Sequence, residues 1–318
     1  MKNRLTKMMN GKSQAYKAFA GSTIGASHLK EGTACQDYSL AFTDGIMAIA
    51  VLADGHGGAD YFRSDRGSRF AVESALEGIR EFIRIRGEIQ TAPPEQTEYE
   101  HLLRHLVKNI LASWYGKVEA DYTKDPPKPE EMEKVSEKKK QRYQDKDALY
   151  LHHAYGTTLI AVAISADYWF GLHIGDGKCV ALYPDGSFKQ PIPWDKRCFL
   201  NITTSLCDDD AAETCRIYFG LEKPVAVFIG SDGVDDSYPF NENEQYLYHL
   251  YQTIALTFAD EGFETAYQHV QDFLPALTGK GSGDDLSIAG FLDMNALKET
   301  AQIQRSQPDD RDTFVSGT

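Results

Sequence analysis

The stretch VLADGHGG, residues 51–58, decides how this chain folds. It continues an apolar run that begins at Ile46, and such a run ending in a turn predicts a buried strand. Asp54 ends the strand, and the three glycines after it allow the backbone to approach a bound group closely. His56 titrates near neutral pH and can transfer a proton. Asp-Gly is also a common way to leave a strand, so these residues alone are equally compatible with a plain turn.

The composition is that of a globular protein long enough for one large domain. The chain has 318 residues, of which 42% are hydrophobic and 25% are charged. A net charge of −14 argues against a nucleic-acid partner, which would need a basic face. We find neither a secretory signal nor an apolar run long enough for a membrane span. The five cysteines lack CxxC spacing, so we expect free thiols in a cytoplasmic protein, which we take to be a monomer.

Alternating and apolar segments predict strands and helices typical of one α+β domain with two stacked sheets. Strands are expected over 16–24, 38–42, 46–53, 159–165, 168–174, 178–183, 224–230 and 288–292. Amphipathic helices are expected over 60–86, 99–120, 247–258 and 263–273. Strands 38–42 and 46–53 are close in sequence and should pair as antiparallel neighbours. The three strands from 159 to 183 are spaced like a meander, in which Asp176 is a hairpin turn residue.

Four segments differ from the rest of the chain. Residues 121–148 are rich in Glu, Lys and Gln, and we expect a solvated helix or a mobile excursion there rather than a binding arm. Residues 187–223 show no sustained period, which is more typical of a functional flap than of a linker. Residues 1–15 and 294–318 are expected to be flexible tails, which leaves 16–293 as the domain.

Aspartates stand at four separate strand edges, at Asp37, Asp54, Asp232 and Asp284. If the sheets bring them together, each like-charge pair costs on the order of 4 kcal/mol at an effective dielectric constant of about 20. Such a cluster needs a counter-charge, and ligands that are all oxygen select hard cations such as Mg²⁺ or Mn²⁺. Two such cations can activate a water for attack on phosphorus, and His56 can protonate the leaving alkoxide.

Several short motifs together resemble one family. DGHGG at 54–58, GTT at 156–158, GDG at 175–177, SDGVDD at 231–236 and GDDLS at 283–287 occur in the order of the metal-dependent PP2C-type protein serine/threonine phosphatases. The likeness spans about residues 16–293, and GASH at 25–28 with CQD at 35–37 looks most like a bacterial branch. The resemblance implies a four-layer α-β-β-α sandwich, with two mainly antiparallel sheets flanked by helix pairs. It also implies hydrolysis of phosphoserine and phosphothreonine by an enzyme that binds two Mg²⁺ or Mn²⁺ ions, or three such ions.

The resemblance further implies roles for single residues. Asp54 resembles the carboxylate that bridges both cations, Gly55 the carbonyl ligand and His56 the general acid. The remaining ligands, direct or through water, are matched by Asp37, Asp232 and Asp284. The positions for a third, weaker cation are matched by Asp176 and Asp236, while Asp235 is a neighbour that does not bind. The segment 187–223 falls where the family has its variable flap.

The chain departs from the family pattern at two positions. Gln36 stands where an acid usually precedes the aspartate matched by Asp37, and Gly32 stands where a phosphate-binding arginine is usual. Lys30 or His28 can supply the missing positive charge, and Arg63 and Arg66 are more distant candidates. The lost arginine favours one alternative function, a catalytically weak relative that binds phosphoproteins as a regulatory module. A metal-dependent nuclease or phosphodiesterase is a third possibility, which the acidic composition disfavours.

Overall fold

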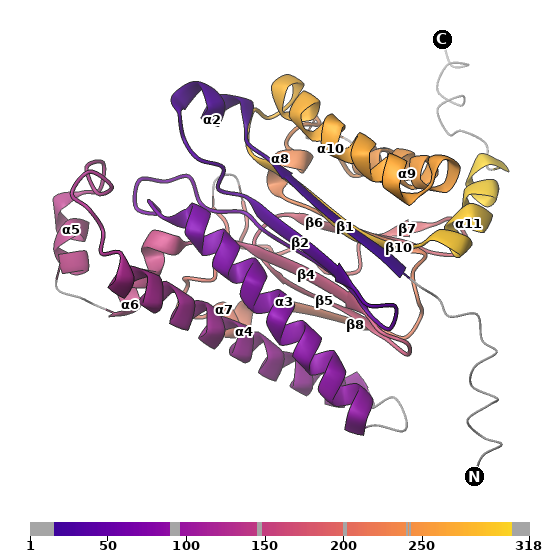
Figure 1. Ribbon diagram of the computed structural model, residues 1–318, viewed down its shortest axis with the longest axis horizontal. Helices are drawn as coiled ribbons and strands as arrows, with labels where there is room; N and C mark the ends of the chain where they lie inside the picture. Colours follow the sequence, from indigo (N-terminus) through magenta and orange to yellow (C-terminus); the bar gives the residue numbers. More distant parts are fainter. Residues whose placement is uncertain are drawn as a thin grey trace.

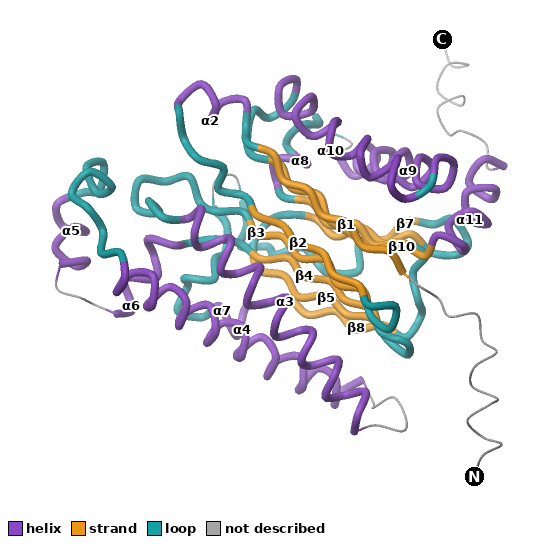
Figure 2. The backbone as a smooth tube through the Cα atoms, in the orientation of Figure 1, coloured by secondary structure: helices purple, strands orange, loops and turns teal. Residues whose placement is uncertain are grey.

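Two stacked antiparallel sheets form the centre of the protein, and helices cover both outer faces (Figures 1 and 2). The computed structural model describes residues 16–89, 96–144, 148–199, 202–239, 241 and 243–306. One sheet has the order β1 (Tyr16–Thr23), β10 (Leu286–Asp293), β9 (Ala226–Gly230), β6 (Lys178–Leu182) and β7 (Phe188–Lys189). The other has the order β2 (Tyr38–Thr43), β3 (Ala48–Ala53), β4 (Leu159–Ile164), β5 (Trp169–Ile174) and β8 (Arg216–Gly220).

Five long helices form the outer layers. The β2–β8 sheet is covered by α3 (Ser64–Ile89) and α4 (Gln96–Lys124), and the other sheet by α9 (Asn243–Glu261), α10 (Phe263–Lys280) and α11 (Met294–Ser306). The shorter helical elements are α2 (Ala26–Glu31), α5 (Glu137–Gln144), α6 (Ala148–Leu151), η1 (His152–Tyr155), α7 (Ala211–Thr214) and α8 (Asp232–Asp235). The predicted four-layer α-β-β-α sandwich is confirmed.

The layers explain why β3 is apolar along its whole length. Ala48, Ala50 and Leu52 face the second sheet, whereas Ile49 and Val51 face α3 and α4. A strand buried on both faces shows no polar alternation, because neither face meets water. All six residues of β3 are buried, and this rigid strand delivers Asp54 at its end.

Two sequence-based predictions about the sheets are wrong. β4 and β5 pair as expected, but β6 pairs with β9 in the other sheet, so the three strands are not a meander. The chain crosses between the sheets at Gly175, whose φ of 111° suits glycine. The segment 187–223 is also less irregular than expected, since it contains the edge strand β8 and the short strand β7.

The C-terminal part of the domain extends beyond the predicted boundary. Residues 294–306 form α11 instead of a tail, because Leu297 and Ala301 pack into the apolar cluster under α9 and α10. The Asp293 carboxylate accepts hydrogen bonds from the N–H groups of Asn295 and Ala296 and so caps the N-terminus of α11. The rest of the predicted tails, 1–15 and 307–318, lies outside the described residues.

In the charged segment expected over 121–148, the described residues 121–144 are docked on the domain, contrary to the expectation of a solvated helix or an excursion. Its side chains are mostly charged, but Val135 and Tyr143 are buried in the cluster that includes α3 and α4. In the part of the chain that the structure describes, no helix has the length and apolar character that crossing a membrane requires.

Candidate active site

The predicted aspartates meet at one end of the sandwich. Asp37 precedes β2 and Asp54 follows β3, and the pairing of Tyr38 with Ala53 sets them beside each other. In the other sheet, Gly230 pairs with both Ile288 and Lys178, which brings the ends of β9, β10 and β6 together. The carboxyls of Asp54 and Asp232 interact with each other. The charge of Asp232 also interacts with the charges of Asp176, Asp236 and Asp284.

Asp37 is a buried carboxylate without a protein partner. Asp37 is 5% exposed, and neither of its carboxylate oxygens has a hydrogen-bond partner. Burial raises the pKa of Asp37 to about 8, the nearby hydroxyls of Ser287 and Ser231 oppose this rise, and the carboxylates of Asp232 and Asp285 add to it. An unpaired buried carboxyl is costly unless a proton or a cation neutralises it. The residue therefore fits the role of a cation ligand.

The other carboxyls are shifted in the same direction. Burial raises the pKa of Asp54 well above its usual range, with further contributions from Asp37 and Asp232. Burial likewise raises the pKa of Asp232 to about 6. A set of close carboxylates that hold protons near neutral pH is a set that divalent cations can bind by displacing those protons.

Asp54 is held by the GTT motif, for which the sequence indicated no role. The backbone oxygen of Asp54 accepts hydrogen bonds from Thr157 Oγ1 at 2.7 Å and from the Thr158 N–H at 2.8 Å. Thr158 Oγ1 in turn accepts a bond from the Asp54 N–H. A Cβ on Gly55 would lie 2.7 Å from the backbone oxygens of both Gln36 and Ser64, so only glycine fits there.

The turn around Asp176 is fixed by the flap-like segment. The Gly175 N–H donates to Thr204 Oγ1 at 2.9 Å, and the Gly175 oxygen accepts a hydrogen bond from Arg216. Burial raises the pKa of Asp176, and Asp236 adds to the rise. Asp235 instead forms an ion pair with Lys178 at 3.3 Å. Thr204 accepts a hydrogen bond from the Asp176 turn and Arg216 donates one to it, a feature that the sequence did not reveal.

His56 lies next to the carboxylates in a tight backbone setting. Its N–H donates to the Gly156 oxygen at 3.1 Å, and its ring meets the edge of the Tyr61 ring at 4.8 Å between centroids. Burial lowers the pKa of His56 to about 4, and His153 lowers it further. The imidazole is therefore neutral at pH 7 in the protein alone.

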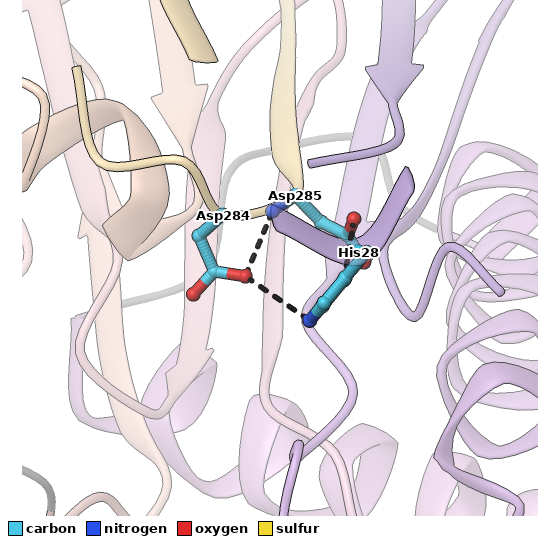
Figure 3. Close-up of side chains that lie close together, drawn as sticks. All are labelled: His28, Asp284 and Asp285. Carbon is cyan, nitrogen blue, oxygen red and sulfur yellow. Dashed lines mark hydrogen bonds and ion pairs between the residues drawn. The ribbon is translucent and has the colours of Figure 1, made fainter. Parts of the chain in front are cut away.

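His28 approaches the site from α2, as Figure 3 shows. Its Nδ1 lies 2.9 Å from Asp285 Oδ1, and its Nε2 lies 3.9 Å from Asp284 Oδ1. The Asp285 carboxylate also accepts bonds from the N–H groups of Gly25 and Gln36, both at 2.6 Å. Asp285 thus joins α2, the Gln36 loop and β10, whereas Asp284 is exposed. Lys30, on the same helix as His28, is exposed.

Arg63 and Arg66, the more distant candidates for phosphate binding, are already paired with carboxylates. Arg63 binds Glu131, and Arg66 binds Asp121 and Asp125. These ion pairs hold both guanidinium groups against the carboxylates of residues 121–131.

The comparison with protein families decides the identity of the domain. A family model described as protein phosphatase 2C matches residues 24–275. The chain belongs to the protein phosphatase 2C family. The family resemblance drawn from the motifs is confirmed, and with it the class of enzyme, a metal-dependent protein serine/threonine phosphatase.

Solved structures share the fold of this phosphatase. PppA of Pseudomonas aeruginosa is 15% identical, with 87% of this chain and 97% of that one covered at a TM-score of 0.53. Stp1 of Staphylococcus aureus is 16% identical, with 87% and 94% covered at a TM-score of 0.50. The catalytic domain of PstP, in complex with two manganese ions, is 14% identical, with 87% and 97% covered at a TM-score of 0.50. A comparison with curated proteins found no match.

Proposed function

We propose that this phosphatase removes phosphate from phosphoserine and phosphothreonine in proteins, with the clustered aspartates holding two Mg²⁺ or Mn²⁺ ions. The observation that carries the assignment is Asp37, a buried carboxylate that has no protein partner and lies among other carboxylates. Asp54 lies near Asp37 and Asp232, and its carboxylate together with the Gly55 carbonyl would help to hold the cations. The remaining ligands, direct or through water, are Asp232 and Asp284.

A third, weaker cation is assigned to Asp176 and Asp236. Both carboxyls interact with Asp232, and burial raises the pKa of each. When bound, the divalent cations supply Lewis acidity toward phosphoryl oxygens and lower the pKa of water. The oxygen ligands of this site suit hard cations, and no His or Cys is needed among them.

His56 is assigned as the general acid for the leaving oxygen of serine or threonine. The backbone N–H of His56 donates a hydrogen bond to the Gly156 oxygen, and the imidazole ring contacts the Tyr61 ring. The pKa of about 4 in the protein alone is too low for this task, but an adjacent phosphate dianion favours the imidazolium. The proton then lies at the imidazole until the leaving oxygen takes it.

Phosphate binding is assigned to α2 in place of the missing arginine. His28 Nε2 faces Asp284 at the edge of the carboxylate cluster, and Lys30 is exposed on the same short helix. Lys30 offers a positive charge and His28 an imidazole, where Gly32 has no side chain. The substrate is a phosphoprotein, and we propose that the enzyme acts as a monomer in cytoplasmic bacterial signalling. The described cysteines are all free thiols, in agreement with a reducing compartment.

Hydrolysis of an aryl phosphate and of a phosphothreonine peptide, with Mn²⁺ present, tests the assignment. Asp54→Asn should lower kcat by about 10²-fold or more, because the central carboxylate is lost. Asp167→Asn, in an exposed turn, is the matched control and should leave kcat unchanged. Absence of turnover by a protein that still binds Mn²⁺ would refute the enzyme and support a regulatory binding module.

A further inference from the structure

The charged segment 125–144 packs against the loop that directly follows His56. We call residues 125–144 the brace and residues 57–66 the site loop. Within the site loop, which includes the first residues of α3, the Tyr61 N–H donates to Gly58 O and the Ser64 N–H to Tyr61 O, both at 2.9 Å, and the Arg66 N–H donates to Arg63 O at 3.1 Å. Its conformation also depends on what the rest of the protein places against it.

Arg63 is the first point of attachment. This arginine is 1% exposed, and its Nε and Nη2 atoms donate to the two carboxylate oxygens of Glu131 at 2.8 and 3.0 Å. Nη1 donates to the Asp125 backbone oxygen at 2.7 Å and to the Tyr155 hydroxyl at 2.9 Å. A bidentate, buried pair of this kind has a defined geometry. It therefore ties the site loop to the brace and to the residues just before Gly156.

Asp60 is the second point of attachment. Lys139 in α5 forms an ion pair with the Asp60 carboxylate, and the Tyr143 hydroxyl donates to the Asp60 backbone oxygen at 3.0 Å. The buried Tyr143 ring also meets the Phe62 ring edge-on at 5.3 Å between centroids. Two turns of a mostly charged helix thus contact two residues of the site loop.

The site loop passes this restraint on to His56. Tyr61 lies between the two attachment points, at Asp60 and Arg63, and its ring touches the His56 ring. A Cβ on Gly156 would lie 2.5 Å from the Tyr61 ring and 2.9 Å from the His56 ring, so the three residues are in close contact. Movement of Tyr61 would therefore change the position of the imidazole.

We infer that the brace positions His56 through the site loop, with Lys139 and Glu131 as positioning residues. The inference rests on the proposed role of His56 as the general acid. Since the contacts hold the acid and touch neither the carboxylate cluster nor α2, loosening them should lower kcat and leave KM unchanged.

Two adjacent lysines of α5 provide a matched test. Lys139 contacts Asp60, whereas Lys140 pairs with Glu137 of its own helix at 2.8 Å. Lys139→Ala should lower kcat about threefold for a substrate with a poor leaving group, an effect in the range of a partly exposed ion pair, at unchanged KM. Lys139→Arg should restore the rate and Lys140→Ala should not change it. Glu131→Gln should have a larger effect, about tenfold, because it breaks the bidentate pair that Glu131 forms with the buried Arg63.

Amide hydrogen exchange of the chelator-treated protein gives a readout that does not depend on activity. Lys139→Ala should speed exchange about threefold in residues 57–66 and at the His56 N–H, with no change in Lys140→Ala. Equal exchange in the two variants would overturn the inference. Faster exchange with unchanged kcat would also overturn it, because the brace would then be structural only. If wild-type protein shows no turnover, the proposed function fails, and the exchange at His56 still decides whether the brace positions that residue.

Discussion

Asp37→Asn should stabilise the cation-free protein at neutral pH, although it removes a cation ligand. The carboxyl has a pKa of about 8 in the folded protein and an ordinary value of 3.8 when unfolded. Between these values the folded state holds a proton that the unfolded state has lost. Stability therefore falls as pH rises through this window, by ~1.4 kcal/mol per pH unit for one carboxyl. From pH 5 to pH 7 the Asp37 carboxyl alone should cost about 3 kcal/mol of unfolding free energy.

Urea unfolding in the presence of a chelator, at pH 5 and pH 7, measures this loss. Other carboxyls contribute with the same sign, so the difference between wild type and Asp37→Asn reports Asp37 together with its effect on the pKa of Asp54, and Asp167→Asn serves as the control. With Mn²⁺ present the wild-type trend should reverse, because cations bind the deprotonated carboxylates of the folded state. The reasoning is refuted if wild type and Asp37→Asn show the same pH dependence in chelator.

Four more substitutions give separate tests. His56→Ala should lower kcat by about 10²-fold for poor leaving groups and much less for good ones, as steady-state rates on a series of aryl phosphates will show; equal losses would deny the acid role. Gly67→Ala should lower the free energy of unfolding by at least ~2 kcal/mol, because its Cβ would lie 1.9 Å from Tyr155 O. Gly116→Ala on α4 meets open space and should raise the free energy of unfolding by ~0.5–1 kcal/mol, as measured by urea unfolding. Thr204→Val should weaken the third cation site by freeing the Gly175 N–H, which Mn²⁺ titration checks; unchanged affinity would contradict the coupling.

Local patterns were informative where one segment carries its own evidence. The apolar run before Asp54 predicted β3, because a strand buried on both faces has no polar positions. The short connection between β2 and β3 predicted their antiparallel pairing and thus the approach of Asp37 to Asp54. The motifs indicated the family, which the family comparison confirmed. The α11 helix was missed although Asp293 caps it, because its apolar face is sparse and has meaning only against α9 and α10.

The sequence by itself determined which segments are strands around Asp54 and which family the chain resembles, and it predicted which side chains are candidates to bind a cation. Only the tertiary structure decided that Gly175 to Gly177 cross between two sheets, since a hairpin turn has the same local residues. It alone also paired Arg63 with Glu131 and set Asp285 beside His28. The physical reason is that periodicity reports which face of a segment is buried, whereas the partner of that face depends on packing between residues far apart in the chain.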